Sequence, residues 1–208
     1  ARYSATYVTM ARLVREGTLG RPAFGLQTTF GWRAGVHHSG TDRHAYLWER
    51  GIHDLDTMRF IFGSAPRRTW GHSFNPDWSP YRGGGGAYGW VEFEDGATCG
   101  YMCTFVAHKG GGSFRLELEG GSIEPTADGI SLNRPGTKEA EILPLDEVKD
   151  STTILLDGFS DYIERGVEPE FSGRQNLTTV AMVEAMGVSS DEGRIIDFDE
   201  YLKRPAAG

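Results

Sequence analysis

The feature that most constrains the fold is a run of strand-like segments between residues 67 and 119, with helical spacing on either side. Near its centre, Glu94-Asp-Gly-Ala97 separates two alternating segments at residues 87–93 and 98–106. Asp-Gly at such a position is a tight-turn signal, because both residues tolerate the positive φ that a short hairpin turn requires. The stretch therefore predicts an antiparallel hairpin in the middle of the chain.

Alternating and helical spacings extend this pattern to the rest of the chain. Strands are predicted where apolar residues alternate with small or polar ones, at residues 24–32, 67–74, 114–119, 129–132 and 141–143. Helices are predicted where apolar residues recur every three or four positions between capping residues, from Ser4 to Gly17, Tyr46 to Gly63, residue 155 to Gly166 and Ser172 to residue 188.

This order of elements predicts an α+β fold, in which one open, mostly antiparallel sheet has helices over one face. The opposite face would expose strand residues that are not strongly polar, Tyr88, Trp90 and Tyr101 among them. Large apolar patches are rare on monomers, so this face favours pairing with a second copy of the chain.

Length and charge narrow the class of protein. The 208 residues suit one domain that can fold without a disulfide or a metal. The net charge is -8 and no long Lys/Arg run is present, which argues against a nucleic-acid partner. The apolar runs are shorter than a membrane span and the N-terminus lacks a signal pattern, so we expect a cytoplasmic protein with no membrane partner.

Two short motifs, a cysteine pair and a glycine-rich stretch, are typical of functional sites, but the neighbouring sequence does not support such a site. Cys99 and Cys103 lie four residues apart on a predicted strand, so both thiols face one side, too far apart to bond, and we expect them reduced and half-buried. Gly84 to Gly89 satisfies the string G-x-G-x-x-G, but a Pro-containing loop precedes it and a hairpin follows, instead of a strand and a helix N-terminus. We expect a surface loop at Gly84 to Gly89. Gly110 to Gly112 likewise lacks the strand and the helix N-terminus that a dinucleotide site requires.

The residues with the clearest chemical potential lie in the helix predicted after Tyr46. Glu49 and His53 are four apart, hence side by side on one helix face, and Asp56 follows on nearly the same stripe. A carboxylate beside an imidazole holds its tautomer and favours its protonated form, which suits proton transfer near neutral pH. Taken alone, the spacing favours a solvated surface ion pair, because structural pairs are also common.

A metal site is not expected. The side chains that could supply ligands are Glu49, His53 and three histidines of the preceding loop, His37, His38 and His44, but their spacing fits no ligand signature. A metal-dependent hydrolase that uses the His-rich loop would require stoichiometric metal in the purified protein.

The same helix carries a resemblance to a known family. Gly51-Ile-His-Asp-Leu-Asp56, followed by Arg59-Phe-Ile-Phe-Gly63, resembles the Gly-x-His-x-x-Asp…Gly segment of the Gfo/Idh/MocA oxidoreductases. Further motifs match in the family's order across nearly the whole chain: Arg2-Tyr3, residues 13–20, 93–97, 172–177, 183–185 and 189–194. This ordered coincidence is more specific than any one of the motifs.

The resemblance implies a two-domain parent enzyme that transfers hydride from a sugar, cyclitol or related hydroxy compound to NAD or NADP. An N-terminal Rossmann domain, which this chain does not contain, would bind the cofactor and supply a lysine for proton transfer. Residues 1–208 would form the C-terminal domain, which binds a polyol or hydroxy-acid substrate and builds homodimers or tetramers through the open sheet face. Without the Rossmann domain, we expect the chain to be inactive.

By the same resemblance, His53 would handle the proton of the substrate hydroxyl, with Glu49 orienting it. The family usually has Asp at the position of Glu49, so the carboxylate here is one methylene longer. Asp56 is interpreted as structural, tying the helix to its neighbours.

The end of the first strand is the second part of the site that the resemblance implies. It places Trp32 on the nicotinamide side and Arg33 next to the substrate. Arg33, together with three histidines of the following loop, would form a cationic rim for a carboxylate or several hydroxyls: His37, His38 and His44. An ordinary polar loop is the alternative for His37 and His38.

A different class of function is also compatible with the sequence. The chain could be a stand-alone binding or oligomerisation module that keeps the fold and has lost the chemistry. Glu49 in place of Asp and the missing cofactor domain favour this alternative.

Overall fold

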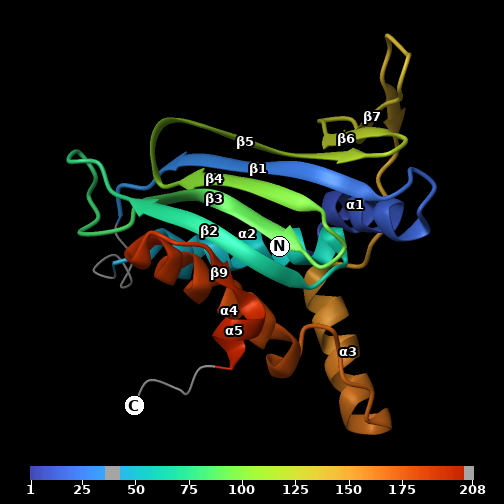
Figure 1. The fold of residues 1–208 in the computed structure, drawn as a ribbon. Coiled ribbons are helices and arrows are strands. Elements are labelled where there is room, and N and C mark those ends of the chain that lie inside the picture. Colours follow the sequence, from blue (N-terminus) through green and yellow to red (C-terminus); the bar gives the residue numbers. More distant parts are fainter. Residues whose placement is uncertain (36–42, 204–208) are drawn as a thin grey trace.

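The computed structural model describes residues 1–35 and 43–203 and confirms the α+β fold (Figure 1). Among these residues, nine strands form one open sheet in the order β8-β7-β6-β5-β1-β4-β3-β2-β9. The pairing of β1 with β4 is parallel and the other neighbouring pairs of these strands are antiparallel, so the sheet is mostly antiparallel, as predicted. The turn at Glu94–Ala97 joins β3 to β4 in the expected hairpin.

The elements lie close to their predicted positions. The strands are β1 (Pro22–Trp32), β2 (Pro66–Phe74), β3 (Gly86–Phe93), β4 (Thr98–Thr104), β5 (Val106–Leu118), β6 (Gly121–Pro125), β7 (Ile130–Asn133), β8 (Glu141–Leu143) and β9 (Ile196–Asp197). The helices are α1 (Ala5–Glu16), α2 (Ile52–Phe62), α3 (Ser151–Arg165), α4 (Gly173–Glu192) and α5 (Phe198–Leu202). None of the helices in residues 1–35 and 43–203 combines the length and the apolar character needed to cross a membrane.

Capping residues end the helices where the sequence indicated. The hydroxyls of Ser4 and Ser172 accept hydrogen bonds from the third backbone N–H beyond them, at 3.4 and 3.1 Å, and so begin α1 and α4. Gly17 and Gly63 end α1 and α2 with φ angles of 66° and 65°, a left-handed conformation that favours glycine. Capping depends on residues that are close in sequence, which explains why these helix ends can be predicted from the sequence alone.

The strand register separates a helix-covered face from an open face. Gln27, Tyr101, Gly89 and Gly71 are paired across β1, β4, β3 and β2 and so share one face. A Cβ added to Gly71 would lie 2.3 Å from Cγ of Met186, which shows that α4 packs directly against this face.

The prediction that Tyr101 faces the open side is therefore wrong. Tyr101 is 2% exposed on the helix-covered face, because it pairs with Gly89 and not with Tyr88 or Trp90. Adjacent strand residues point to opposite faces, so one position of offset decides the side.

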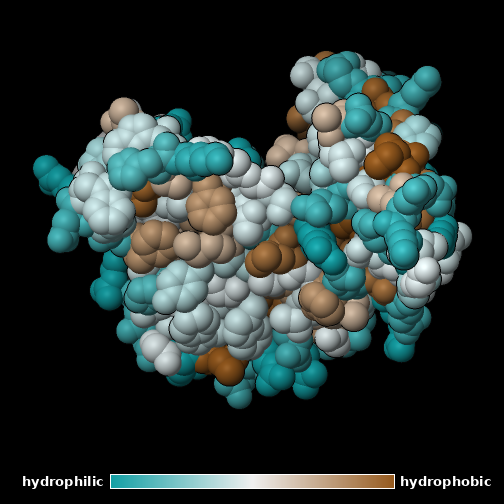
Figure 2. Space-filling model, turned by 90° about the horizontal axis from the view of Figure 1, so that it is seen from above, coloured by the Kyte–Doolittle hydropathy of each residue, from teal (hydrophilic) through white to brown (hydrophobic). Residues whose placement is uncertain are grey.

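The open face carries Tyr88 and Trp90, the other two residues that the sequence predicted there. Leu26, Gly100, Trp90 and Trp70 form one row across four strands. Phe24 and Leu26 are 59% and 48% exposed. Figure 2 shows the side away from α3, α4 and α5, where several hydrophobic side chains lie among residues of intermediate hydropathy.

Three details differ from the predictions. The predicted helix after Tyr46 begins with a π-helical turn, Leu47–Gly51, before α2. Gly110 to Gly112 lie inside the long strand β5. Cys99 and Cys103 are free and fully buried on the helix-covered face, not half-buried, and burial raises the pKa of the Cys103 thiol to about 12.

Candidate functional site

The π-helical turn Leu47–Gly51 positions the first candidate residue. A π-helical turn carries one residue more than an α-helical turn and is frequent at functional sites. Glu49 lies in this turn, and its side chain is only 6% exposed. Its carboxylate forms an ion pair with the guanidinium of Arg33, which follows the last residue of β1.

Arg33 is held in place by two further contacts. Its backbone N–H donates to the carbonyl of Phe105 at 3.0 Å. Its guanidinium lies over the ring of Phe105, 5.3 Å from the ring centroid. The Arg33–Glu49 pair thus joins the end of β1 to the turn before α2, and a nearly buried carboxylate is compensated by a fixed cation.

His53 lies in the first turn of α2, four residues after Glu49, and its side chain is exposed. An exposed imidazole at this place can meet a group that approaches from outside the domain. The two residues predicted to handle a proton are therefore brought to the same end of α2, one anchored by Arg33 and one open.

A buried hydroxyl and carboxylate cluster lies under the same end of α2. Oδ2 of Asp54 accepts hydrogen bonds from the hydroxyls of Tyr46 at 2.9 Å and Tyr101 at 3.1 Å. Nε of Arg50 lies 3.3 Å from Oδ1 of Asp54. Burial raises the pKa of the Asp54 carboxyl, and Arg50 and the two hydroxyls oppose this effect. The cluster ties the π-helical turn and α2 to strand β4.

The raised pKa of Asp54 predicts that the free energy of unfolding decreases as the pH rises through this pKa. In the folded state, the pKa of the Asp54 carboxyl lies above its ordinary value of 3.8. Asp54 therefore contributes stability at pH values below 3.8, and this contribution is lost as the pH rises through the higher pKa of the folded state. We expect Asp54→Asn to flatten this part of the pH dependence of the unfolding free energy. Urea denaturation at a series of pH values measures this pH dependence. The matched control is Asp128→Asn, at an exposed aspartate. Equal slopes for wild type and Asp54→Asn would refute the assignment.

His44 and Trp32, two further residues predicted for the site, have partners of their own in the structure. His44 is turned to α4, with Nε2 3.3 Å from Oδ1 of Asp191. Trp32 stacks on His108, with ring centroids 5.5 Å apart, and His108 stacks on Trp78 at 6.0 Å. His37 and His38 lie outside the described residues.

The carboxylate of Asp56 connects α2 to the start of the chain and to α4, in agreement with the structural role predicted from the sequence. Nε and Nη2 of Arg2 donate to its two carboxylate oxygens at 2.7 and 2.5 Å. The hydroxyl of Thr179 on α4 donates to Oδ1 at 3.1 Å. The start of the chain, α2 and α4 therefore meet at one carboxylate.

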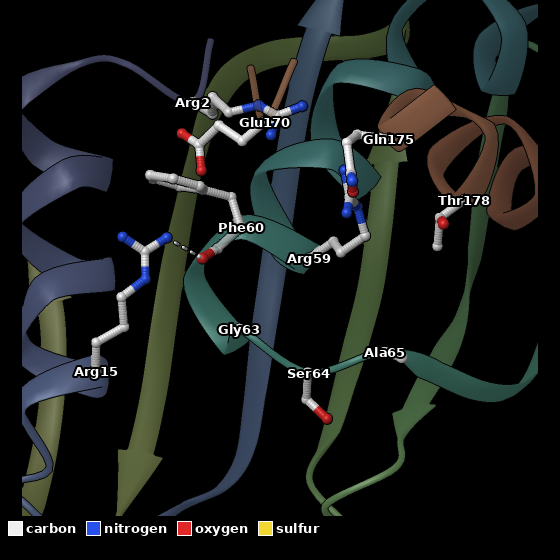
Figure 3. A pocket seen from close by; sticks show the side chains of 10 residues that line it. All are labelled: Arg2, Arg15, Arg59, Phe60, Gly63, Ser64, Ala65, Glu170, Gln175 and Thr178. Atoms are coloured by element: carbon white, nitrogen blue, oxygen red, sulfur yellow. Dashed lines mark hydrogen bonds between the residues drawn. The ribbon is translucent and has the colours of Figure 1, made fainter. Parts of the chain in front are cut away.

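A cavity of about 390 Å³ adjoins this junction at the C-terminal end of α2 (Figure 3). Arg2, Arg15 and Arg59 line it, and Arg15 donates to the carbonyl of Phe60 at 3.4 Å. Arg2 and Arg59 share Asp56, the latter at 3.7 Å. Among the described residues, none that was predicted for the site lines this cavity, and its arginines contact the junction of α1, α2 and α4.

The sequence interpretation missed Asp54, Tyr46 and Tyr101 as site residues. Asp54 stands next to His53 in the motif, which is the one signal that could have drawn attention to it. The two tyrosines come from different elements, and only the fold brings them to Asp54.

In residues 1–35 and 43–203, no group of three or more His, Cys, Asp or Glu side chains is placed to hold a metal ion. The His-rich loop of the hydrolase alternative lies partly outside the described residues.

Comparison with known families decides the relationship. A family model described as the GFO/IDH/MocA C-terminal domain matches residues 7–124, more than half of the chain. The chain belongs to this family. The match includes β1, the π-helical turn, α2 and the central hairpin, and so it contains Arg33, Glu49 and His53.

Relatives in the family include sugar dehydrogenases. D-apiose dehydrogenase of Paraburkholderia graminis is 26% identical over 94% of this chain and 57% of its own length. D-apiose dehydrogenase of Rhizobium rhizogenes is 24% identical over 97% of this chain and 63% of its own length. The chain thus spans less than two thirds of the length of these curated relatives.

Solved structures share the fold. An Agrobacterium radiobacter oxidoreductase, crystallised with NAD+, L-tartaric acid and magnesium, superposes with a TM-score of 0.79 at 19% identity, over 96% of this chain and 63% of that protein. The aldose-aldose oxidoreductase of Caulobacter crescentus, crystallised with glycerol, gives 0.77 at 20% identity, over 94% and 61%. At these identities the superpositions establish the architecture.

Proposed function

We propose that this chain is the substrate-binding and assembly domain of a longer NAD- or NADP-dependent oxidoreductase that acts on a sugar, cyclitol or related hydroxy compound. The observation that carries the proposal is the Arg33–Glu49 pair beside exposed His53, within the segment that matches the family. The D-apiose dehydrogenase relatives support a neutral sugar as the first substrate to test.

The glycine-rich stretch of this chain does not fit a dinucleotide. A Cβ added to Gly86 would lie 2.4 Å from Cζ of Phe74, and one added to Gly89 would lie 2.1 Å from the carbonyl of Trp70. The space beside both glycines is filled, and strand β3 takes the place of the helix that would face a pyrophosphate. In our proposal, the cofactor is therefore bound by the part of the longer protein that precedes this chain.

What this chain contributes is the handling of a proton. The imidazole of His53 exchanges a proton with the substrate hydroxyl, and Glu49, anchored by Arg33, orients the groups around it. A fixed carboxylate near an imidazole stabilises the imidazolium form during such a transfer. The role of Glu49 is one of positioning.

Helix α3 supports the existence of a second domain. It stands away from the sheet in Figure 1, and none of its fifteen residues is buried. One stripe of the helix exposes five large apolar side chains: Leu155, Leu156, Phe159, Tyr162 and Ile163. Ala1 and Tyr3 border the same surface hollow as Val148 and Ser151, so a preceding segment would emerge beside the start of α3.

We expect the exposed stripe of α3 to make the isolated chain self-associate. The double variant Leu156→Glu/Ile163→Glu is expected to reduce this association, since both side chains are more than 60% exposed and belong to the same stripe, two helical turns apart. Sedimentation velocity at several concentrations measures it. Arg165→Glu, at an exposed residue of the same helix outside the stripe, changes the net charge by the same amount and is the control for charge alone. Unaltered association of the Leu156/Ile163 variant would argue against a docking role for α3.

The open sheet face is the proposed surface for assembly into homodimers or tetramers. Phe24, Leu26 and Tyr88 are at least 39% exposed there, and Tyr88 contacts His72 and Trp70. The face also carries charged residues at its sides, Arg115 and Glu117 on β5 among them, and an apolar centre with a polar rim is the composition of a protein–protein interface.

The test of the proposed function uses the full-length protein that contains this chain. NAD+ or NADP+ reduction is followed by absorbance with D-apiose, myo-inositol and L-tartrate as candidate substrates. Turnover of a hydroxy compound by the longer protein, and none by the 208-residue chain, is the expected result. A longer protein that binds neither nucleotide would replace this proposal with a binding or oligomerisation module.

A further inference from the structure

The cavity at the C-terminal end of α2 is lined by more positive than negative charge (Figure 3). Among the described residues that line it, three are arginines, Arg2, Arg15 and Arg59, and one is acidic, Glu170. Its volume of about 390 Å³ is far larger than a single ion requires and falls within the range of small-molecule sites. A cavity of this size and charge fits a small anionic compound.

The three arginines differ in how well the protein compensates their charge. Arg2 donates to both carboxylate oxygens of Asp56, at 2.7 and 2.5 Å, and is fully paired. Arg15 instead contacts two neutral groups of Phe60. It donates to the backbone carbonyl at 3.4 Å, and its guanidinium lies 4.6 Å from the ring centroid. These contacts position Arg15 and leave its charge uncompensated.

Arg59 has the least complete set of partners. Its Nε and Nη2 atoms are buried and have no hydrogen-bond acceptor among the described residues. Oδ1 of Asp56 is 3.7 Å from Nη2, beyond hydrogen-bond distance, and already accepts from Arg2 and Thr179. Burial and, second, the charge of Arg2 lower the pKa of Arg59, although a guanidinium stays a cation at any physiological pH. Native proteins rarely leave buried donors without an acceptor, so these two point to a ligand.

Uncharged polar side chains complete the lining. Gln175 and Thr178 lie three residues apart on α4 and so share one face of the helix. The hydroxyl of Ser64 accepts from the backbone N–H of Asp95 at 3.4 Å, and its own hydrogen can be donated to a ligand. These groups can hydrogen-bond the uncharged part of a compound whose anionic group is held by the arginines.

We propose that this cavity binds a phosphate group, free or carried by a small metabolite, with Arg59 as the principal anchor and Arg15 as a second cation. A phosphate carries up to two negative charges and several acceptor oxygens, which suits guanidinium groups that come from different helices. A carboxylate offers one charge and two oxygens in a plane. The volume beyond one phosphate group leaves room for a hydroxyl-bearing part, as in a sugar phosphate.

The cavity is separate from the proposed proton-transfer site. Arg59 follows His53 by six residues on α2, a distance of about 9 Å along the helix axis, and lies towards its other end. A ligand of the cavity would therefore be an effector or a stabiliser of the junction at Asp56, and not the substrate. This inference does not depend on the proposed function.

The first test is a titration of the 208-residue chain, followed by NMR. Glucose 6-phosphate and inorganic phosphate are expected to shift the amide resonances of Gly63 and Ser64 saturably, while glucose leaves them in place. Tighter binding of glucose 6-phosphate than of phosphate would assign the site to a phosphorylated metabolite, and equal binding would assign it to the free ion. Arg59→Gln is expected to weaken the binding about ten- to hundredfold, through loss of a charge-assisted hydrogen bond.

Three further variants make the test specific. Arg21→Gln removes an arginine that pairs with Glu119 and is 84% exposed, and this matched control should bind like wild type. Arg15→Gln, at an exposed residue of α1, should also weaken binding and remains informative if Arg59→Gln does not fold. Glu170→Gln removes the negative charge from the lining and should strengthen binding up to about fivefold.

The proposal is overturned if neither phosphate compound gives a saturable shift, or if both arginine variants, Arg59→Gln and Arg15→Gln, bind like wild type. The full-length protein gives a second readout. Because a nucleotide domain also binds phosphates, the quantity compared there is the part of the binding that Arg59→Gln removes. This part is expected to persist, and its loss in the longer protein would show that the cavity is covered and would overturn the proposal. Turnover of hydroxy compounds is measured separately, so either proposal can fail alone.

Discussion

His53→Ala in the full-length enzyme is expected to lower kcat about 10²–10⁴-fold, the usual contribution of a positioned general acid or base. The side chain is exposed at the start of α2, so its loss should leave the fold intact. Affinity for NAD+ or NADP+ should change little, because we assign the cofactor to another domain. Steady-state kinetics and a fluorescence titration of the reduced nucleotide measure the two quantities separately.

The control for this prediction is His72→Ala, which removes an exposed histidine of β2 that lies outside the candidate site. It should retain wild-type turnover. Glu49→Gln keeps the size of the side chain but weakens the pair with Arg33, and we expect an intermediate loss of kcat with a shifted pH profile. A His53→Ala enzyme with unchanged kcat would exclude His53 from proton transfer.

Asp56→Ala is expected to lower the free energy of unfolding by about 3–5 kcal/mol, the cost of leaving a buried charge without its partner. The side chains of Arg2 and Asp56 are only 9% and 17% exposed, and Arg2 donates to both carboxylate oxygens. Since domains of this kind are stable by about 5–15 kcal/mol in total, the loss should be large in urea denaturation.

Two further variants calibrate this result. Thr179→Val removes only the hydroxyl that donates to Asp56 and should cost about 1 kcal/mol, so it stays measurable if Asp56→Ala does not fold. Asp157→Ala removes an exposed partner of Lys149 on α3 and should leave the unfolding midpoint nearly unchanged. A similar midpoint for Asp56→Ala and Asp157→Ala would show that the junction at Asp56 is not a source of stability.

Part of the candidate site could be predicted from the sequence. Glu49 and His53 are four residues apart in one motif, and helical geometry places both at one end of α2. Their roles remain predictions. Asp56 was interpreted correctly as structural, although its partners Arg2 and Thr179 lie 54 and 123 residues away and could not be named from spacing.

The contact partners of the residues predicted around the substrate and the nicotinamide could not be derived from the sequence. Arg33 and His44 were expected on the rim for the substrate, with His37 and His38, and Trp32 on the nicotinamide side. In the fold, Arg33 pairs with Glu49, His44 turns to Asp191 on α4, and Trp32 stacks on His108. Each partner comes from a different element, and the geometry of a loop does not follow from its composition.

Local interactions explain the features that could be predicted from the sequence: the helix ends at Ser4, Gly17, Gly63 and Ser172, the hairpin at Glu94–Ala97, and the order of helices and strands. Each depends on residues a few positions apart, because caps and tight turns satisfy their own backbone groups. The order of such elements, together with apolar spacing, then limits the fold to an open sheet covered on one side.

Only the tertiary structure decided which strand residues face the helices and which polar groups meet. Tyr101 is buried against Asp54, one position out of step with the open-face residues Tyr88 and Trp90, because the pairing register sets the side of every residue in a strand. Register is settled by packing across the whole sheet, and no short stretch of sequence contains it.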